Sequence, residues 1–318
     1  MHIFVTGATG FIGTAVVNEL LSAGHQVTGL SRTTQGAEKL HNLGAKARVG
    51  QLDQSALLRE AAADSDGVIH LAFIHGLGHM DLITRLHLFA GALNGGVVSS
   101  FMRILHQTES RAIQALASGL EGTGRPLIVT SGVLMLPSGK ISTEEDNHLK
   151  DAPNRSFSEM AALASVPRGV RASVIRLSAT VHGSGDRGFI PYLIKAARKK
   201  GSSVYIGNGA NRWPAVHVRD AARLFRLALE KGEAGAKYHG VDETGIPFRE
   251  IASKIAAKLQ IPTSSYPTPK SAKHLGFLSS FVGLDNPSSS EWTQRALGWK
   301  PTGPGLLADI DQSDYFKI

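Results

Sequence analysis

The sequence contains no cysteine, and this absence removes a whole set of chemistries. Disulfide bonds, thiolate nucleophiles and cysteine metal sites are excluded, and a cysteine-free chain fits a reducing compartment. No apolar run is long and uninterrupted enough to cross a bilayer, and the first residues form no basic leader. We therefore expect no membrane span, no signal peptide and a cytoplasmic location.

Charge is also sparse, because only 19% of the 318 residues are charged while 42% are hydrophobic. The net charge is +8, yet residues 1–150 are close to neutral and the basic excess falls in residues 151–318. Nucleic-acid binding requires a basic cluster with a recognisable reading motif. The densest basic run, residues 198–200, ends a predicted helix, where cations complement the helix dipole. We expect no nucleic-acid partner, and a phosphate or carboxylate on the substrate is the alternative role for this run.

Glycine, in contrast, is abundant and well placed near the start of the chain. Three glycines spaced three residues apart follow a short apolar strand, residues 3–5, and precede an amphipathic helix, residues 14–23. In such a turn the first glycine allows the bend, the second lets backbone amides approach a pyrophosphate, and the third lets helix and strand pack closely. The anion then lies at the helix N-terminus. The alternative is a glycine-rich surface turn. The dinucleotide site predicted here consists of Gly7, Thr9, Gly10, Phe11, Ile12 and Gly13. A valine at position 10 should put a branched side chain where the pyrophosphate approaches and would strain the backbone if φ there is positive.

The second strand, residues 26–30, ends in Ser31, Arg32 and Thr33 with no acidic residue. A site for NAD usually places an acid there to hold the ribose hydroxyls. Two hydroxyls can instead donate to a phosphate, and the guanidinium can neutralise it with paired hydrogen bonds. The pattern favours NADP(H) over NAD(H), and the alternative is an arginine exposed in a loop.

Strands and helices continue to alternate along the chain. Further strands are predicted at residues 46–49, 67–73, 126–131 and 170–177, with helices at 35–43, 54–63, 109–120 and 152–165 between them. This order predicts an α/β fold, a Rossmann-type doubly wound parallel sheet with a smaller C-terminal substrate-binding region. Residues 1–180 should be mainly dinucleotide-binding and 181–318 mainly substrate-binding, with room for the chain to cross between them. Strand ends should add cofactor contacts from Gln51, Leu52, Leu71, Ala72, Phe73, Ser178 and Val181.

Residues 74–107 are the least regular stretch. His75 and His79 have the spacing of a helical metal pair, but no third ligand is evident, so we expect no metal site. Apolar residues between 89 and 105 could form a dimer helix or a wall over the substrate, which leaves both a monomer and a homodimer open. The C-terminal tail keeps Trp292, Leu297 and Trp299, so we expect it to pack.

Several motifs together resemble the atypical short-chain dehydrogenase/reductases, close to the extended NAD-dependent epimerase/dehydratase family. They are TGATGFIG, GLSR, VTSG, RLSATVHG and GNGANRWPAVHVRDAARLFRLALEKG, and the similarity runs through FREIASKIAAKL to ALGWKPTGPGLLADI. The first motif is widely shared, whereas RWPAVH and the tail are more specific to one atypical subgroup. The resemblance implies NADP binding, a small C-terminal substrate domain and chemistry on a small organic molecule.

The catalytic pattern departs from that family. Related reductases use a serine, a YxxxK tyrosine and lysine, and an upstream asparagine, the tyrosine giving a proton while the hydride arrives. Ser131 matches the serine, whereas Arg155 and Glu159 stand at the tyrosine and lysine positions and Glu109 at the asparagine. Arginine stays protonated and cannot relay a proton. The alternative for Arg155 and Glu159 is a simple helical ion pair.

Two hypotheses remain. The first is an NADP-dependent oxidoreductase whose acid is displaced to His182, His217 or Tyr192, with Ser131 and His182 both near the nicotinamide. The second is a protein that keeps the dinucleotide without net redox, either a non-redox isomerase or cyclase or a cofactor-sensing module. We favour the oxidoreductase. Its candidate catalytic residues are Ser131, His182, Arg155 and Glu109. For His182 the alternative is a structural histidine.

Overall fold

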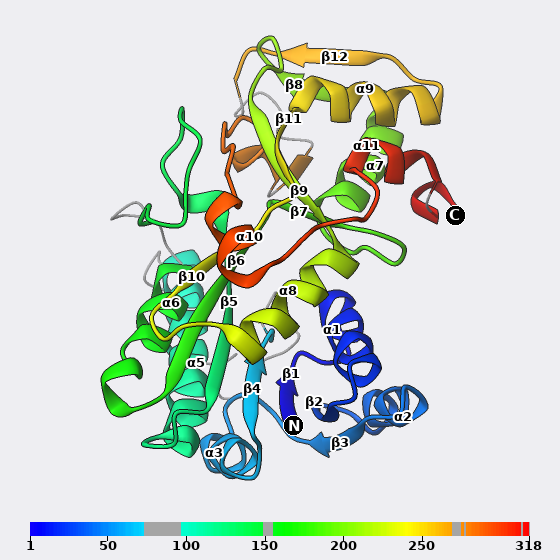
Figure 1. Cartoon of the computed structure of the whole chain (residues 1–318). Helices are drawn as coiled ribbons and strands as arrows, with labels where there is room; N and C mark the ends of the chain where they lie inside the picture. The colour runs from blue at the N-terminus through cyan, green and yellow to red at the C-terminus, as the bar shows by residue number, and fades with distance from the viewer. Residues whose placement is uncertain (73–96, 149–154, 269–274, 277, 313, 318) are drawn as a thin grey trace. The chain divides into compact units, whose positions relative to one another are not determined.

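The computed structural model describes residues 1–72, 97–148, 155–268, 275–276, 278–312 and 314–317 (Figure 1). The chain forms two compact units and crosses between them several times. Unit 1 comprises residues 1–131, 150–174 and 225–236, and unit 2 comprises residues 132–149, 175–224 and 237–318. The crossing after Val174 lies near the boundary predicted at residue 180. Residues 132–149 belong to unit 2 and residues 225–236 to unit 1, unlike the segments on either side of them. Packing decides this, and no local sequence pattern predicts it.

The largest sheet has seven strands in the order β10-β6-β5-β4-β1-β2-β3. All the pairings recorded among β1 to β5 are parallel. Strand order reverses beside β1, which in a doubly wound fold places the ligand crevice at the carboxyl ends of the central strands. The predicted Rossmann-type α/β fold is therefore confirmed. The strands are β1 (His2–Thr6), β2 (Gln26–Ser31), β3 (Lys46–Val49), β4 (Gly67–His70), β5 (Pro126–Gly132), β6 (Arg171–Leu177) and β10 (Lys237–Gly240).

Helices cover this sheet because their apolar stripes share a core with it. Phe4, Leu116 and Val174 belong to one buried cluster that α3, α5 and the sheet build together. Figure 1 shows α5 alongside α6. The helices of unit 1 are α1 (Phe11–Ser22), α2 (Thr34–Asn42), α3 (Ser55–Ala63), α5 (Val97–Leu120) and α6 (Arg155–Leu163).

Helix α5 corrects one expectation. The sequence predicts no regular structure for residues 74–107, but α5 already begins at Val97. Apolar residues at 97, 101, 104 and 105 have helical spacing, and the glycines before them masked this pattern. His75 and His79 lie outside the described residues, and so does Phe73.

Unit 2 contains a three-stranded sheet, β11-β9-β7, and a two-stranded sheet, β12-β8. Its core surrounds Trp213, Phe248 and Leu306, all buried. The strands are β7 (Thr180–His182), β8 (Ser203–Ile206), β9 (Arg212–His217), β11 (Glu243–Pro247) and β12 (Thr263–Tyr266). The helices are α7 (Phe189–Lys200), α8 (Val218–Lys231), whose second half belongs to unit 1, α9 (Phe248–Leu259), α10 (Glu291–Leu297) and α11 (Leu306–Gln312). Short 3-10 turns span Val133–Met135, Val166–Arg168 and Asp314–Phe316.

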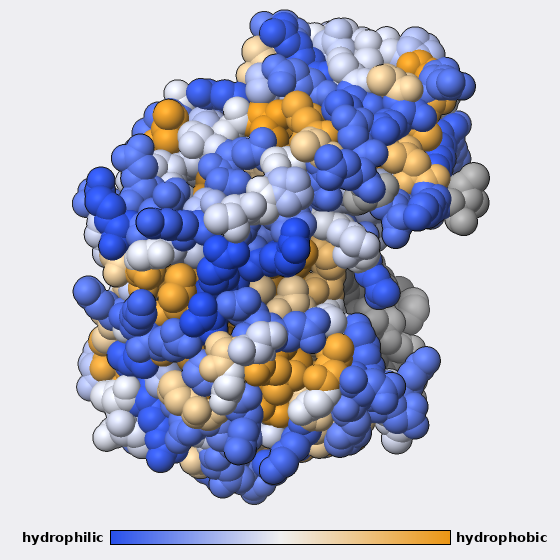
Figure 2. Space-filling model, turned by 45° about the vertical axis from the view of Figure 1, so that its right-hand side comes forward, coloured by the Kyte–Doolittle hydropathy of each residue, from blue (hydrophilic) through white to orange (hydrophobic). Residues whose placement is uncertain are grey.

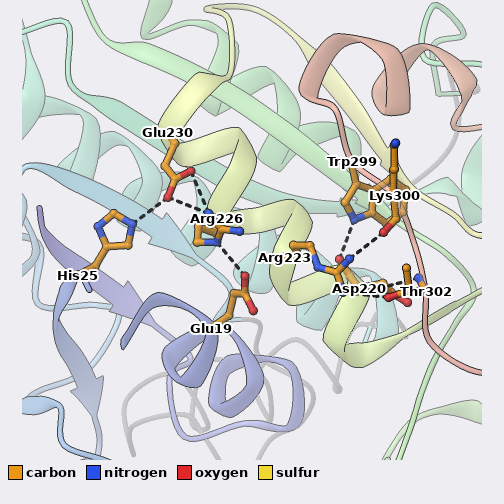
Figure 3. Close-up of polar contacts among 9 residues, drawn as sticks. All are labelled: Glu19, His25, Asp220, Arg223, Arg226, Glu230, Trp299, Lys300 and Thr302. Carbon is orange, nitrogen blue, oxygen red and sulfur yellow. Dashed lines mark hydrogen bonds and ion pairs between the residues drawn. The ribbon is translucent and has the colours of Figure 1, made fainter. Parts of the chain in front are cut away.

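The C-terminal segment of unit 2 is fixed by Asp220 in the first turn of α8 (Figure 3). The buried carboxylate accepts hydrogen bonds from the backbone N of Thr302 at 3.0 Å and of Gly303 at 2.7 Å. Trp299, also fully buried, donates from Nε1 to the Asp220 carbonyl at 3.0 Å. The predicted packing of the tail is therefore confirmed for Trp299 and Leu297, while Trp292 stacks on Tyr238 and stays 38% exposed.

In unit 1 a second polar cluster fixes the end of α1. Figure 3 shows Arg226 between Glu19 and Glu230, with Nε 2.7 Å from Glu19 Oε1 and Nη1 3.1 Å from both Glu230 carboxylate oxygens. His25 Nε2 lies 3.0 Å from Glu230 Oε1. The cluster ties α1, and with it the glycine turn, to the second half of α8.

The surface shows no dominant apolar face in the view of Figure 2, where apolar residues form several small patches among hydrophilic ones. Such patches are ordinary, because apolar atoms are never fully covered. Among the described residues, no helix combines the length and the apolar character that a bilayer crossing needs.

Candidate functional site

The glycine turn between β1 and α1 has room for glycine alone at two positions. Gly7 has φ of +70°, and a Cβ built there would lie 2.7 Å from the Ala72 backbone N. A Cβ on Gly13 would lie 2.0 Å from the Gly7 carbonyl oxygen. Either Cβ would overlap backbone, so these two glycines allow the tight turn and the close packing of α1 against it.

Gly10 differs from its neighbours, because its backbone is ordinary. Its φ is −73° and its ψ is 177°, and a Cβ there would meet only the Gly7 carbonyl oxygen, at 3.3 Å. A side chain at position 10 therefore meets no positive-φ backbone, and that conformation belongs to Gly7. Gly10 is the N-cap of α1 and provides no side-chain cap, so the first amides, at Phe11, Ile12 and Gly13, have no partner within the helix. An anion fits there.

The turn after β2 is built by its own hydroxyl groups. Ser31 is buried, and its Oγ donates to the Thr33 carbonyl at 2.9 Å. Thr33 caps α2 by accepting from the Gly36 N at 3.1 Å. The Ser31 proton is thus used inside the turn, and the Thr33 hydroxyl keeps its proton for another acceptor. Arg32 stands exposed between them.

Lys39 lies at the glycine turn, although no sequence motif predicts it there. It lies on α2, and its Nζ donates to the Thr9 carbonyl at 3.0 Å and to Thr14 Oγ1 at 2.9 Å. An ammonium group has three protons, so a further acceptor can be bound at the glycine turn. No local signal marks this residue, because its partners lie 25 and 30 positions earlier.

The other predicted cofactor contacts lie at the same edge of the sheet. Gly50 N donates to the Ser31 carbonyl at 2.9 Å, which brings Gln51 and Leu52 beside the end of β2. Leu71 N donates to the Thr6 carbonyl at 3.2 Å, and Ala72 N to Thr6 Oγ1 at 3.3 Å. The ends of β1, β2, β3 and β4 therefore converge around the glycine turn.

Ser131 is the penultimate residue of β5, the strand next to β4 in the sheet. It is 2% exposed, and its Oγ has no hydrogen-bond partner among the described residues. A buried hydroxyl without a partner is unfavourable unless a ligand or water completes it. The hydroxyl of Ser131, which the sequence predicts as the family's serine, can therefore form a hydrogen bond with a ligand.

Helices α5 and α6 carry the acidic candidates. Glu109 is buried on α5, and Ser158 on α6 donates to its Oε1 at 2.6 Å. Glu159 is also buried, 5% exposed. Arg155 begins α6, but its side chain lies outside what the structure describes, so its ion pair with Glu159 stays a prediction.

The remaining candidates belong to unit 2, whereas Ser131 belongs to unit 1. Ser178 Oγ donates to the Gly240 carbonyl at 2.8 Å, and Val181 pairs with Val216 inside the small sheet. His182 is 1% exposed, and its Nδ1 lies 2.9 Å from Asp309 Oδ2. Its ring meets His217 edge-on at a centroid distance of 5.4 Å. These contacts favour the structural interpretation of His182.

A hydrogen-bonded carboxyl and phenol pair that the sequence does not predict lies just after β7. Tyr315 OH donates to Asp186 Oδ2 at 2.8 Å and accepts from the Gly183 N at 3.2 Å. Burial raises the pKa of Asp186 to about 6, against the opposing effect of the hydrogen bond from the Gly188 N. Burial also lowers the pKa of His217. The 129-residue separation of Asp186 from Tyr315 hid this pair from sequence inspection.

No cluster of three metal-ligating side chains occurs among the residues that the structure describes. The polar groups gathered at the sheet edge are backbone amides, hydroxyls and cations. Such groups bind phosphates and carbonyl oxygens.

Known proteins resemble this chain over most of its length. Residues 3–241 match the family model described as NAD dependent epimerase/dehydratase family. A Schizosaccharomyces pombe protein is 45% identical over 317 residues, which cover 99% of this chain and 100% of the relative. A ketoreductase of Stigmatella aurantiaca, acting on a farnesyl dihydroquinoline oxide, is 24% identical over 280 residues, 87% of this chain and 80% of that one.

Among solved structures, DesIV, a dTDP-glucose 4,6-dehydratase from Streptomyces venezuelae with NAD bound, superposes with a TM-score of 0.72. It is 20% identical, and the match covers 98% of this chain and 96% of that one. At this identity the likeness shows the fold alone.

Proposed function

Because this chain belongs to the NAD dependent epimerase/dehydratase family, we propose that it is an NADP-dependent oxidoreductase of the carbonyl reductase or alcohol dehydrogenase type. Its substrate is a small organic molecule. The ketoreductase from Stigmatella and a 2-alkyl-3-oxoalkanoate reductase from Stenotrophomonas maltophilia support this reaction class.

The observation that carries the proposal is the unpaired hydroxyl of Ser131. The fold buries it at the carboxyl end of β5 without using its proton. Ligands of doubly wound folds bind outside these strand ends. A carbonyl oxygen placed there would complete the hydroxyl, and the glycine turn on β1 offers the helix amides that fit a pyrophosphate.

Two cations support NADP over NAD. Arg32 follows β2 where an NAD site would carry an acid, and Lys39 reaches the glycine turn. A phosphate on the ribose is dianionic near neutral pH, and both side chains can form charge-assisted hydrogen bonds to it.

In the proposed reaction the bound nicotinamide supplies the hydride. Ser131 Oγ donates a hydrogen bond to the substrate oxygen, on which negative charge develops as the carbonyl is reduced. Arg155 can hold that oxygen or another anionic group, but it cannot release a proton. The proton for the new alcohol therefore comes from a carboxyl, imidazole or phenol group. Glu109 is a candidate for this acid, because it stands at the position of the family's upstream asparagine.

Single-turnover oxidation of NADPH against a panel of aldehydes and ketones tests the proposal. We expect Ser131→Ala to lower kcat/KM by roughly 100-fold, the usual effect of losing a polarising donor. Ser173→Ala is the matched control, because Ser173 Oγ on β6 is also buried and unpaired but lies within the strand. Equal effects of the two substitutions would remove Ser131 from the mechanism.

A second candidate function is dinucleotide binding without net redox, in an isomerase or cyclase or in a cofactor sensor. Arg155 and Glu159 at the tyrosine and lysine positions favour it, because arginine cannot release a proton and glutamate cannot supply the positive charge that lysine provides. Tight NADPH binding without oxidation by any compound of the panel would support this candidate over the oxidoreductase.

A further inference from the structure

His70 is a buried polar side chain at the carboxyl end of β4, in a strand that is otherwise apolar. The residue is 1% exposed, and the two residues before it, Val68 and Ile69, are fully buried. In the sheet, β4 lies between β1, which leads into the glycine turn, and β5, which carries Ser131. A histidine placed there loses its hydration, so packing alone does not account for it.

The ring of His70 forms a hydrogen bond with the residue just before the glycine turn. Its Nδ1 lies 2.8 Å from Thr6 Oγ1, which also accepts from the Ala72 N at 3.3 Å. Among the described residues, Nδ1 is the acceptor that the Thr6 proton reaches. The threonine therefore donates, and we assign to His70 the neutral tautomer with its proton on Nε2. The backbone of His70 is held as well, because its carbonyl accepts from Thr130 Oγ1 at 3.0 Å.

Thr6 in turn holds the end of β4 against the glycine turn. Its carbonyl accepts from the Leu71 N at 3.2 Å, and its hydroxyl accepts from the Ala72 N. At this place the two backbones nearly touch, since a Cβ on Gly7 would lie 2.7 Å from the Ala72 N. The Thr6 proton points to His70, which leaves a lone pair of the hydroxyl for Ala72. His70 thus fixes the orientation in which Thr6 bridges the turn and β4.

We propose that His70 is a positioning residue for the dinucleotide. Acting through Thr6, it holds the turn at Gly7 in the conformation that presents the N-terminal amides of α1 to a pyrophosphate. His70 itself needs no contact with the cofactor. A turn that is already fixed binds more tightly, because less of it has to be ordered on binding. The inference deepens the proposed function and rests on its dinucleotide site.

Two matched pairs of variants test this hydrogen bond by fluorescence titration with NADPH. Thr6→Val removes the hydroxyl with little change of shape, so Kd should rise about tenfold or more, whereas Thr6→Ser keeps it and should stay within about twofold of wild type. In His70→Asn the side-chain amide reaches the position of Nδ1 and keeps the bond, while in His70→Gln it lies one atom further out. His70→Gln should therefore raise Kd about tenfold, and His70→Asn less than about threefold. Equal Kd values within either pair would overturn the proposal.

Thr28→Val is the control for a purely structural effect. Thr28 Oγ1 lies 2.8 Å from His2 Nε2, so the same sheet has a second threonine–histidine pair, where β1 begins and away from the glycine turn. Breaking this pair can lower Tm but should leave Kd for NADPH unchanged. If Thr6→Val lowers Tm and keeps the wild-type Kd, or if both variants raise Kd alike, His70 serves stability alone and the proposal fails.

The double variant tests whether the two residues act as one unit. Thr6→Val and His70→Gln break the same hydrogen bond, so together they should give a Kd within about twofold of Thr6→Val alone. Losses that add would mean that the residues act separately, which contradicts the proposal.

The titration needs no turnover, so it is independent of the reaction. Wild type that binds NADPH but reduces no carbonyl compound would refute the oxidoreductase, while the role of His70 would still be decided by the variants. Reduction of a ketone together with an unchanged Kd in Thr6→Val would refute the role of His70 and leave the oxidoreductase standing. Wild type that binds neither NADPH nor NADH would overturn both.

Discussion

Arg32 and Lys39 bring two positive charges to the end of β2 and to the glycine turn. A charge-assisted hydrogen bond to phosphate contributes about 1.5–3 kcal/mol. We therefore expect NADPH to bind at least about tenfold more tightly than NADH, and Arg32→Ala or Lys39→Ala each to reduce that ratio by about tenfold. Fluorescence titration of both dinucleotides measures it.

Lys46→Ala is the control for this pair. Lys46 is exposed at the start of β3, so its loss changes the net charge equally without touching the strand ends. If all three variants shift the ratio alike, the preference comes from the general field of the protein. If none does, neither cation contacts the phosphate.

Gly10 separates binding from folding at the same turn. A valine there meets an ordinary backbone, so we expect the fold to survive while the side chain blocks the pyrophosphate and dinucleotide binding falls by about tenfold or more. Gly13→Ala should instead lower Tm, because its Cβ would overlap the Gly7 carbonyl. Titration and thermal melts of both variants check this, and normal binding by Gly10→Val would refute the phosphate-loop assignment.

Helix α8 carries the next prediction, at the scale of one element. Asp220 in its first turn accepts from two backbone amides, and Arg223 Nη2 lies 3.1 Å from Oδ1. Removing a fully buried carboxylate leaves these donors unpaired, which costs about 3 kcal/mol. We expect Asp220→Ala to lower the free energy of unfolding by that amount, in urea titrations followed by tryptophan fluorescence.

Arg219→Ala is the companion variant, because Arg219 is the exposed preceding residue of the same helix. Its effect should stay within about 0.5 kcal/mol, as for most surface substitutions. Similar losses in the two variants would mean that α8, and not the Asp220 contacts, limits stability.

At the scale of the whole molecule, Asp186 makes stability depend on pH. Burial raises the pKa of its carboxyl from 3.8 to about 6. Between these values the folded chain keeps a proton that the unfolded chain has released. The contribution of this group is therefore most favourable below about pH 4, falls as the pH rises to about 6, and stays low above that.

Asp186→Asn should remove this dependence. The difference in unfolding free energy between variant and wild type should grow by about 2 kcal/mol between pH 4 and 7, with the variant gaining. Urea titrations across this range measure the difference. Other carboxylates lose their stabilising contacts in acid in both proteins, so their effect cancels when the two unfolding free energies are subtracted. A constant difference would show that Asp186 titrates normally.

Local pattern predicted most elements closely. Strand β3 begins and ends at the predicted residues, and helices α2 and α3 differ from the predicted ranges by no more than one residue at either end, because each has a clear pattern bounded by turn residues. Helix α5 was predicted too short, since glycines before Val97 suggested a loop. For the candidate site, the glycine turn and Ser131 could be found from motif and strand order, whereas Lys39 and Asp186 could not.

The sequence by itself determined the doubly wound fold, the glycine turn and the absence of an acid after β2, because these features depend on neighbours within a few residues. Only the tertiary structure decided which polar atoms remain unpaired. Asp309 reaches His182 across 127 positions, while among the residues that the structure describes no group forms a hydrogen bond with Ser131 Oγ. Such pairings arise from the packing of distant segments, and spacing along the chain carries no record of them.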